Sequence, residues 1–177
     1  MCNRFCNHTI TYSVSKNLVA TLKDYKGNAF SGVKVTIKLS NGKSYTKTTD
    51  KNGQVKLGIS NLVPKTYTAT ITFAGNSNYA KSTKSVKVTV KKATPKLTAK
   101  AKTFKIKTKT KKYAVTLKNN KGKVMKSKKL TLRVNGKTFS AKTNSKGVAT
   151  FKITNLKKKG TFKATIKYAG SKYYNKL

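Results

Sequence analysis

The stretch Val33-Lys-Val-Thr-Ile-Lys-Leu39 decides the fold, because apolar and polar residues alternate along its whole length. This alternation places the apolar side chains on one face of a β-strand and the polar side chains on the other. Val, Ile and Thr are residues that strands prefer. The pattern therefore predicts a half-buried strand with one face in a core and one face in water.

The same alternation recurs along the chain and predicts an all-β protein. No segment shows the i, i+3, i+4 apolar spacing of an amphipathic helix. Short strands at regular spacing, separated by turns, are typical of an antiparallel sandwich. The further predicted strands are 55–59, 67–73 and 86–90 in the first half, and 130–134, 149–153 and 162–168 in the second.

The two halves of the chain repeat each other. Thr21-Leu-Lys corresponds to Thr116-Leu-Lys, an offset of 95 that falls to 94 after Ser40 and returns to 95 near Pro64. Self-similarity of this kind indicates duplicated domains. We expect a boundary near Pro95, since Pro removes a ladder donor. Four glycines of the first copy, Gly27, Gly42, Gly53 and Gly75, align with Gly122, Gly136, Gly147 and Gly170.

Turn chemistry separates the predicted strands. Asn41-Gly42 and Asn135-Gly136 predict type I′ hairpins, which need positive φ at both central residues. Asp50 and Asn144 each begin a four-residue turn that ends in Gly, where the side chain can bond its own backbone. Because Asn replaces Asp in the second copy, we interpret Asp50 as structural, and Asp24 likewise.

The charge of the chain excludes several kinds of site. The chain has 42 Lys and Arg against 2 Asp and Glu, a net charge of +40, and neither acid lies beyond residue 94. Carboxylate pairs and oxygen-ligand Ca²⁺ or Mg²⁺ cages are therefore excluded from the second half. The lone His and both Cys lie in the first eight residues, so no catalytic constellation can be assembled and we expect no enzyme.

The N-terminal residues carry the few remaining candidates. Cys2, Cys6 and His8 form a C-x3-C-x-H spacing that matches no zinc pattern and lacks a fourth ligand. We therefore expect no metal and no cofactor; whether Cys2 and Cys6 pair stays open. The stretch Asn7-His8-Thr9 is a glycosylation sequon. No apolar run could span a membrane, and no signal-peptide core follows Arg4.

Each copy closes on a shared motif that resembles a known class of repeat. The two endings are Tyr67-Thr-Ala-Thr-Ile-Thr-Phe-Ala-Gly75-Asn-Ser-Asn-Tyr79 and Phe162-Lys-Ala-Thr-Ile-Lys-Tyr-Ala-Gly170-Ser-Lys-Tyr-Tyr174. They resemble the immunoglobulin-like (Ig-like) repeats of prokaryotic surface proteins. The Lys, Thr and Asn richness is most similar to adhesin-like proteins of methanogenic archaea. The resemblance implies extracellular tandem arrays and supplies no catalytic residues.

Together these observations predict two tandem Ig-like β-sandwiches. We expect an irregular segment over 1–17, a first domain over 18–93 and a second domain over 94–177. Copy one continues past Tyr79 into a strand, whereas copy two ends at Leu177, so the second domain should lack its last strand and have an open edge. The favoured explanation is a fragment of a longer array with its N-terminus upstream; strand exchange between neighbours is the alternative.

The expected function is a stalk, spacer or adhesion module at the cell surface. Lysines on the wet faces would attract anionic wall polymers, host glycans or other surface proteins. The alternative is nonspecific nucleic-acid binding; specific recognition is disfavoured because Arg is limited to Arg4 and Arg133 and Trp is absent. Related surface domains carry Lys–Asn isopeptide links whose formation a carboxylate assists. The second domain has no carboxylate side chain, so we expect no such link there.

Overall fold

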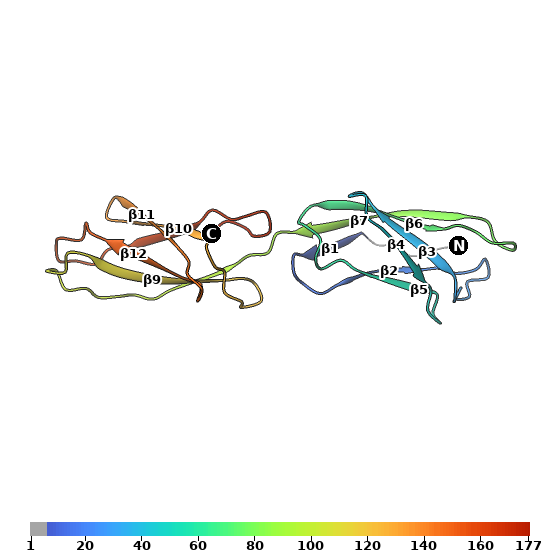
Figure 1. Cartoon of the computed structure of the whole chain (residues 1–177), viewed down its shortest axis with the longest axis horizontal. Helices are drawn as coiled ribbons and strands as arrows, with labels where there is room; N and C mark the ends of the chain where they lie inside the picture. The colour runs from blue at the N-terminus through green and yellow to red at the C-terminus, as the bar shows by residue number, and fades with distance from the viewer. Residues whose placement is uncertain (1–6) are drawn as a thin grey trace. The chain divides into compact units, whose positions relative to one another are not determined.

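The computed structural model describes residues 7–177, and this range contains β-strands and no helix. The chain divides into two compact units, unit 1 up to Lys91 and unit 2 from Lys92 to Leu177. In Figure 1 the colours run from blue to green along unit 1 and from green through yellow to red along unit 2. Each unit is described by itself below.

Unit 1 is an antiparallel sandwich of two sheets with one added parallel strand. The five-stranded sheet has the order β1-β7-β6-β3-β4, and β2 and β5 form the facing pair. The strands are β1 (His8–Thr11), β2 (Asn17–Thr21), β3 (Lys34–Leu39), β4 (Ser44–Thr48), β5 (Gln54–Gly58), β6 (Thr66–Phe73) and β7 (Ser82–Lys91).

The alternating residues of these strands form the core of unit 1. Leu18 on β2, Ile37 on β3 and Val88 on β7 have no exposed side-chain surface. Phe30 closes one end of this core, with its ring centroid 5.5 Å from Phe73 and 4.7 Å from Tyr79. Burial of such side chains is worth about 1.5–3 kcal/mol each, so the sandwich is stabilised chiefly by its inward faces.

Unit 2 repeats most of this arrangement with two three-stranded sheets, β11-β10-β13 and β12-β9-β8. Its core contains Leu117, Leu132 and Phe151, all fully buried. The strands are β8 (Lys96–Ala99), β9 (Lys111–Lys118), β10 (Lys129–Val134), β11 (Lys137–Lys142), β12 (Val148–Ile153) and β13 (Ala164–Tyr168).

The two units differ at their first and last strands. Strands β9 to β13 are the counterparts of β2 to β6, but unit 2 has no strand equivalent to β7. In unit 1, β1 runs parallel to β7 and bonds to it. In unit 2, β8 instead pairs antiparallel with β9. Unit 2 of the described chain thus lacks a last strand, as the sequence predicts.

The expectation of an irregular segment over 1–17 is wrong for part of that range. Strand β1 lies within it, β2 begins at Asn17, and Ile10 is buried in the core. The reason is that β1 has only four residues and is held by a nonlocal partner, Val88 to Lys91 of β7, which no local pattern reveals. Cys2 and Cys6 lie outside the described residues.

The two Asn-Gly hairpins turn out to be different. Asn135 and Gly136 have φ of 45° and 75°, which fits the predicted type I′ turn between β10 and β11. The prediction is wrong for Asn41-Gly42, where only Gly42 has positive φ. The first copy carries one additional residue here, so the loop is longer and needs a left-handed residue only at its end.

Candidate functional site

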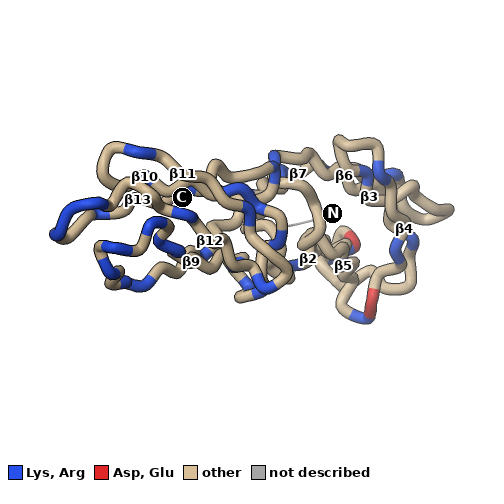
Figure 2. Tube along the Cα trace, turned by 60° about the vertical axis from the view of Figure 1, so that its left-hand side comes forward, with Lys and Arg blue, Asp and Glu red and all other residues tan. Residues whose placement is uncertain are grey.

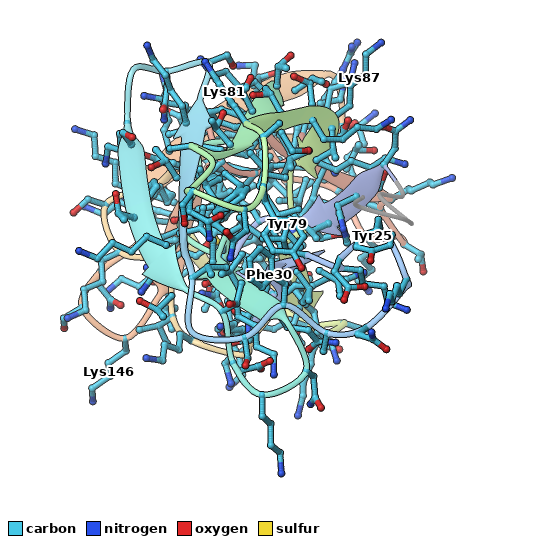
Figure 3. All side chains as sticks on the ribbon, turned by 90° about the vertical axis from the view of Figure 1, so that its right-hand side faces the viewer. Tyr25, Phe30, Tyr79, Lys81, Lys87 and Lys146 are labelled. Atoms are coloured by element: carbon cyan, nitrogen blue, oxygen red, sulfur yellow. The ribbon has the colours of Figure 1, made fainter. Side chains whose placement is uncertain are left out.

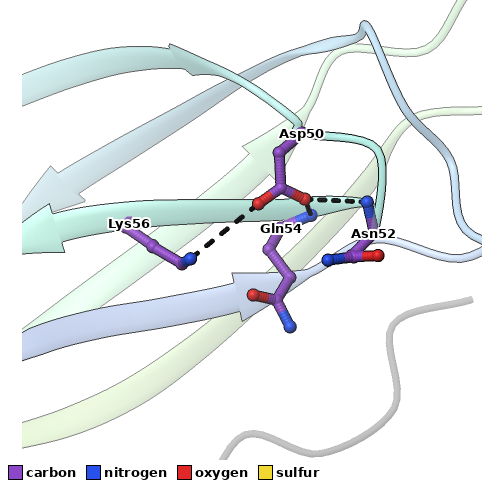
Figure 4. Close-up of polar contacts among 4 residues, drawn as sticks. All are labelled: Asp50, Asn52, Gln54 and Lys56. Atoms are coloured by element: carbon purple, nitrogen blue, oxygen red, sulfur yellow. Dashed lines mark hydrogen bonds and ion pairs between the residues drawn. The ribbon is translucent and has the colours of Figure 1, made fainter.

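The acidic residues of unit 1 serve its turns. The Oδ1 atom of Asp50 accepts hydrogen bonds from the backbone N–H groups of Asn52 and Gln54, both at 2.9 Å (Figure 4). Its Oδ2 atom lies 3.9 Å from Nζ of Lys56. In unit 2, Asn144 accepts the corresponding two backbone bonds at 2.9 and 3.0 Å. The amide of Asn144 thus accepts the same backbone hydrogen bonds as the carboxylate of Asp50, so both side chains stabilise their turns.

Hydrogen bonding lowers the pKa of both carboxyls. The backbone bond from Gln54 has the largest effect on the pKa of Asp50, and together with the other contacts it outweighs partial desolvation. For Asp24, desolvation raises the pKa most, but the combined bonds from Asn28 and the neighbouring backbone prevail. Both side chains are therefore anions at neutral pH, and neither is tuned to donate a proton.

Within residues 7–177, no three His, Cys, Asp or Glu side chains gather to form a metal site. His8 lies on β1, and the acids lie in separate turns of unit 1. In the same part of the chain, no helix is long and apolar enough to cross a membrane. The expectation that no residue here is catalytic or metal-binding stays a prediction.

Lysines cover the outer faces of both units. Figure 2 shows basic positions along the strands and loops of each unit, and acidic positions in unit 1 alone. Lys81, Lys87 and Lys146 extend into solvent in Figure 3. Because only two carboxylate side chains oppose the basic residues, the chain has a net charge of +40. Such a surface attracts anions of many kinds without selecting one of them.

Lys111 is the exception, as the only buried charged side chain among the described residues. Its Nζ atom donates hydrogen bonds to the backbone oxygen of Thr108 at 2.7 Å and, more weakly, of Ile106 at 3.4 Å. Lys111 therefore ties the preceding loop to the start of β9. The sequence did not predict this role, because neighbouring lysines give the same local pattern.

Unit 2 also contains a wide groove that the sequence alone did not delimit. Its volume is about 790 Å³, within the range of ligand-binding clefts. The groove lies beside β13, between the segment that precedes β9 and the loop that leads into β13. Its apolar wall includes Phe104, Ile106, Tyr113, Val134, Ile153, Leu156 and Phe162, and its cations are Lys102, Lys111, Lys158 and Lys159.

Comparisons with known proteins support the fold. Residues 13–91 match the family model of the bacterial Ig-like domain, group 1. A search of curated proteins found no match. Among solved structures, the chain is similar to invasin, a bacterial integrin-binding protein, with a TM-score of 0.57 and 18% identity over 94% of this chain and 35% of the invasin chain.

Other similar structures include bacterial adhesins at lower scores. A tetra-tandem repeat from the extending region of a large adhesion protein has a TM-score of 0.45 and 15% identity, over 95% of this chain and 46% of that chain. The D0-D1 domain of intimin has a TM-score of 0.35 and 15% identity, over 97% and 93%.

The likeness to invasin defines the class of fold, which is an all-β chain of Ig-like sandwiches. The predicted fold class is thereby confirmed. The chain spans about a third of the invasin chain. The family match covers unit 1 from residue 13 onward, and unit 2 repeats its strand order as far as the counterpart of β6.

Proposed function

We propose that the chain is a non-enzymatic Ig-like module of a cell-surface adhesin-like protein, where it acts as a stalk or spacer. The observation that carries the proposal is the tandem repetition of one sandwich whose outer faces are covered with Lys and Thr. Repeated small domains are a common way to build extended structures. Invasin, whose fold is similar, is itself a bacterial integrin-binding protein.

The proposal includes an extracellular location in a longer array of such repeats, as in the adhesin-like proteins of methanogenic archaea. A direct test is to raise antibodies against the chain and apply them to intact source cells. Labelling of intact cells, lost after mild surface proteolysis, is the expected result. Labelling only after the cells are permeabilised would overturn the surface location.

A second part of the proposal is that the lysine coat binds anionic wall polymers or glycans. A net charge of +40 favours polyanions through counterion release, so affinity should fall steeply with salt. The test uses heparin and polyglutamate as anionic probes and dextran as a neutral control, across salt concentrations. Binding of both polyanions but not of dextran is expected at low salt. Equal binding of dextran would overturn the electrostatic basis.

Nucleic-acid binding is the alternative, because phosphate would be attracted by the same charge. The described residues provide no helix for the major groove. Duplex DNA should therefore bind without sequence preference and dissociate at roughly 0.2 M salt, where multi-phosphate contacts are much weakened. Sequence-selective binding that persists at this salt would favour the alternative over the surface role.

A further inference from the structure

Unit 2 places lysines directly opposite one another on neighbouring strands. The register pairs Lys112 of β9 with Lys152 of β12, and Lys118 of β9 with Lys96 of β8. Like charges at directly opposite positions of a sheet are destabilising. In the strand pairs of the described part of unit 1, no lysine lies opposite another lysine. The opposed pairs are therefore a property of unit 2 and not of the shared fold.

Both pairs lie on the outer face of the sheet β12-β9-β8. Val115 and Leu117 of β9 point inward and are buried, so Lys112 and Lys118 point outward. All four lysines of the two pairs are exposed. Lys112 and Lys118 are six residues apart on β9, which corresponds to about 20 Å along a strand. The face thus has a pair of positive charges at each of two ends.

The surface between the two pairs carries small and hydroxyl-bearing side chains. The outward residues here are Thr98, Ala114, Thr116, Val148 and Thr150. The threonine hydroxyls can donate and accept hydrogen bonds. No aromatic residue occupies an outward position of these three strands, so the face has no ring on which a nucleic-acid base can stack. Its chemistry matches a ligand that has both anionic groups and hydroxyl groups.

The corresponding face of unit 1 is not charged in this way. The pair at the β12 end of the face has neutral counterparts in unit 1, Asn17 and Gly58. Strand β5 carries one outward lysine, Lys56, and its Nζ atom lies 3.9 Å from Oδ2 of Asp50. Unit 1 therefore supplies a carboxylate beside the cation on this face.

Unit 2 has no carboxylate side chain that can neutralise its opposed lysines. Residues 92–177 contain 27 of the 42 basic residues and neither acid (Figure 2). Asn144 stands at the position of Asp50. A strand added beside β13 would leave the face exposed, because β13 belongs to the other sheet. The counterions of these lysines are therefore solvent ions or the anionic groups of a ligand.

We propose that the outer face of β12-β9-β8 binds an acidic polysaccharide that lies along β9. Carboxylate or sulfate groups of the polymer pair with the lysines at both ends, and its hydroxyl groups bond to the threonines between them. Binding relieves the repulsion within each pair, so the ligand stabilises unit 2 in particular. The other opposed pair of unit 2, Lys129 and Lys142, lies in the sheet β11-β10-β13 and offers a single anchor.

This inference rests on the second part of the proposed function, the binding of anionic polymers by the lysine coat, and assigns that binding to one face. The test adds the full chain to dye-labelled oligogalacturonate, a chain of carboxylated sugars long enough to span about 20 Å. Binding is followed by fluorescence anisotropy at about 0.15 M salt, where long-range attraction is screened.

Two variants with equal charge separate the face from the rest of the coat. The face variant carries Lys96→Gln, Lys112→Gln, Lys118→Gln and Lys152→Gln. It should bind at least about tenfold more weakly, because each exposed charge pair contributes up to a few-fold in affinity. The control variant changes four exposed lysines outside these strands to Gln, namely Lys137, Lys157, Lys163 and Lys167, and should lose less than about threefold. Equal losses would overturn the assignment to this face and leave the lysine coat in place.

Further probes test the class of ligand. Galacturonic acid, a single sugar, reaches only one lysine pair and should not bind. Heparin oligosaccharides of the same length should bind the face as well, and the tighter of the two polymers identifies the anionic group. Polyglutamate and single-stranded DNA with the same number of charges should bind more weakly. Equal or tighter binding of either would overturn a polysaccharide ligand. Failure of every polyanion to bind would overturn both this inference and the proposed binding by the coat.

Measurements of stability test the physical cause. Saturating oligogalacturonate should slow amide exchange in unit 2 and leave unit 1 unchanged, since a ligand stabilises the folded state that binds it. Lys152→Gln removes one charge of an opposed pair and should raise the free energy of unfolding of unit 2. Lys167→Gln should raise it less, because Lys167 lies opposite Thr131. Equal slowing in both units, or equal effects of the two substitutions, would overturn the proposal.

Discussion

A matched pair of substitutions tests whether the inward face of β13 is uncovered. Ile71 and Ile166 occupy the same position in the two repeats. Ile71 is 6% exposed on β6, which has β7 as its neighbour, whereas Ile166 is only partly buried on β13, which has no strand in that place. Ile71→Ala and Ile166→Ala remove identical atoms, so the two losses of stability differ only through the surroundings of each side chain.

The expected magnitudes follow from burial. Truncation of a buried Ile to Ala costs about 2–5 kcal/mol, which includes the cavity that remains. For Ile71, loss of three carbon groups at about 0.8 kcal/mol each plus a cavity term gives about 3 kcal/mol. For Ile166, part of the side chain is already in water and no closed cavity forms, so the loss is about 1 kcal/mol.

Hydrogen exchange followed by mass spectrometry measures the two units separately in the full chain. The slowest amides of each unit report its free energy of unfolding. The expected result is a drop in unit 1 for Ile71→Ala about three times the drop in unit 2 for Ile166→Ala. Equal losses would show that Ile166 on β13 is covered as fully as Ile71 on β6, and the reasoning from burial would be refuted.

Three further changes test the turns and the buried lysine. Folding lowers the pKa of Asp50, so its carboxylate stabilises folded unit 1 above the ordinary pKa of 3.8, and this stabilisation is lost as pH falls through the pKa of the folded state. Asp50→Asn should therefore flatten the pH dependence of the free energy of unfolding of unit 1 below about pH 4. An unchanged pH dependence would contradict this. Gly53→Ala should cost more than about 3 kcal/mol, since its Cβ would clash with the backbone oxygen of Leu22. Gly27→Ala, also at positive φ but with open space around its Cβ, should cost about 1 kcal/mol; equal melting temperatures would refute the clash. Lys111→Met should destabilise unit 2 by about 1 kcal/mol and speed exchange in the loop it ties, because two backbone oxygens lose their donor; no change in that loop would contradict the role.

The sequence predicts what depends on local pattern. Alternation located β3, β6 and β10, because the side chains of a half-buried strand must sort to two faces. The Asx turns at Asp50 and Asn144 followed for the same reason, since their hydrogen bonds reach only a few residues along the chain. The missing last strand was predicted by comparing the two copies.

The features that the sequence missed depend on distant partners. Strand β1 is stabilised by β7, whose paired residues lie eighty positions further along the chain, as His8 and Val88 do. The burial of Lys111 depends on how the loop before β9 folds back over it. The groove beside β13 requires the positions of Phe104 and Phe162 in space, which no spacing along the chain supplies.

Amide exchange along β6 and β13 tests the central claim most directly, namely that unit 2 offers an unpaired strand edge. By NMR, the amides of Ala69 and Ile71 should exchange slowly because β7 accepts their bonds. Those of Ala164 and Ile166 should exchange rapidly, while the neighbouring amides of Thr165 and Lys167 stay protected through β10. Equal protection of Ala164 and Ile166 with their unit 1 counterparts would contradict the open edge.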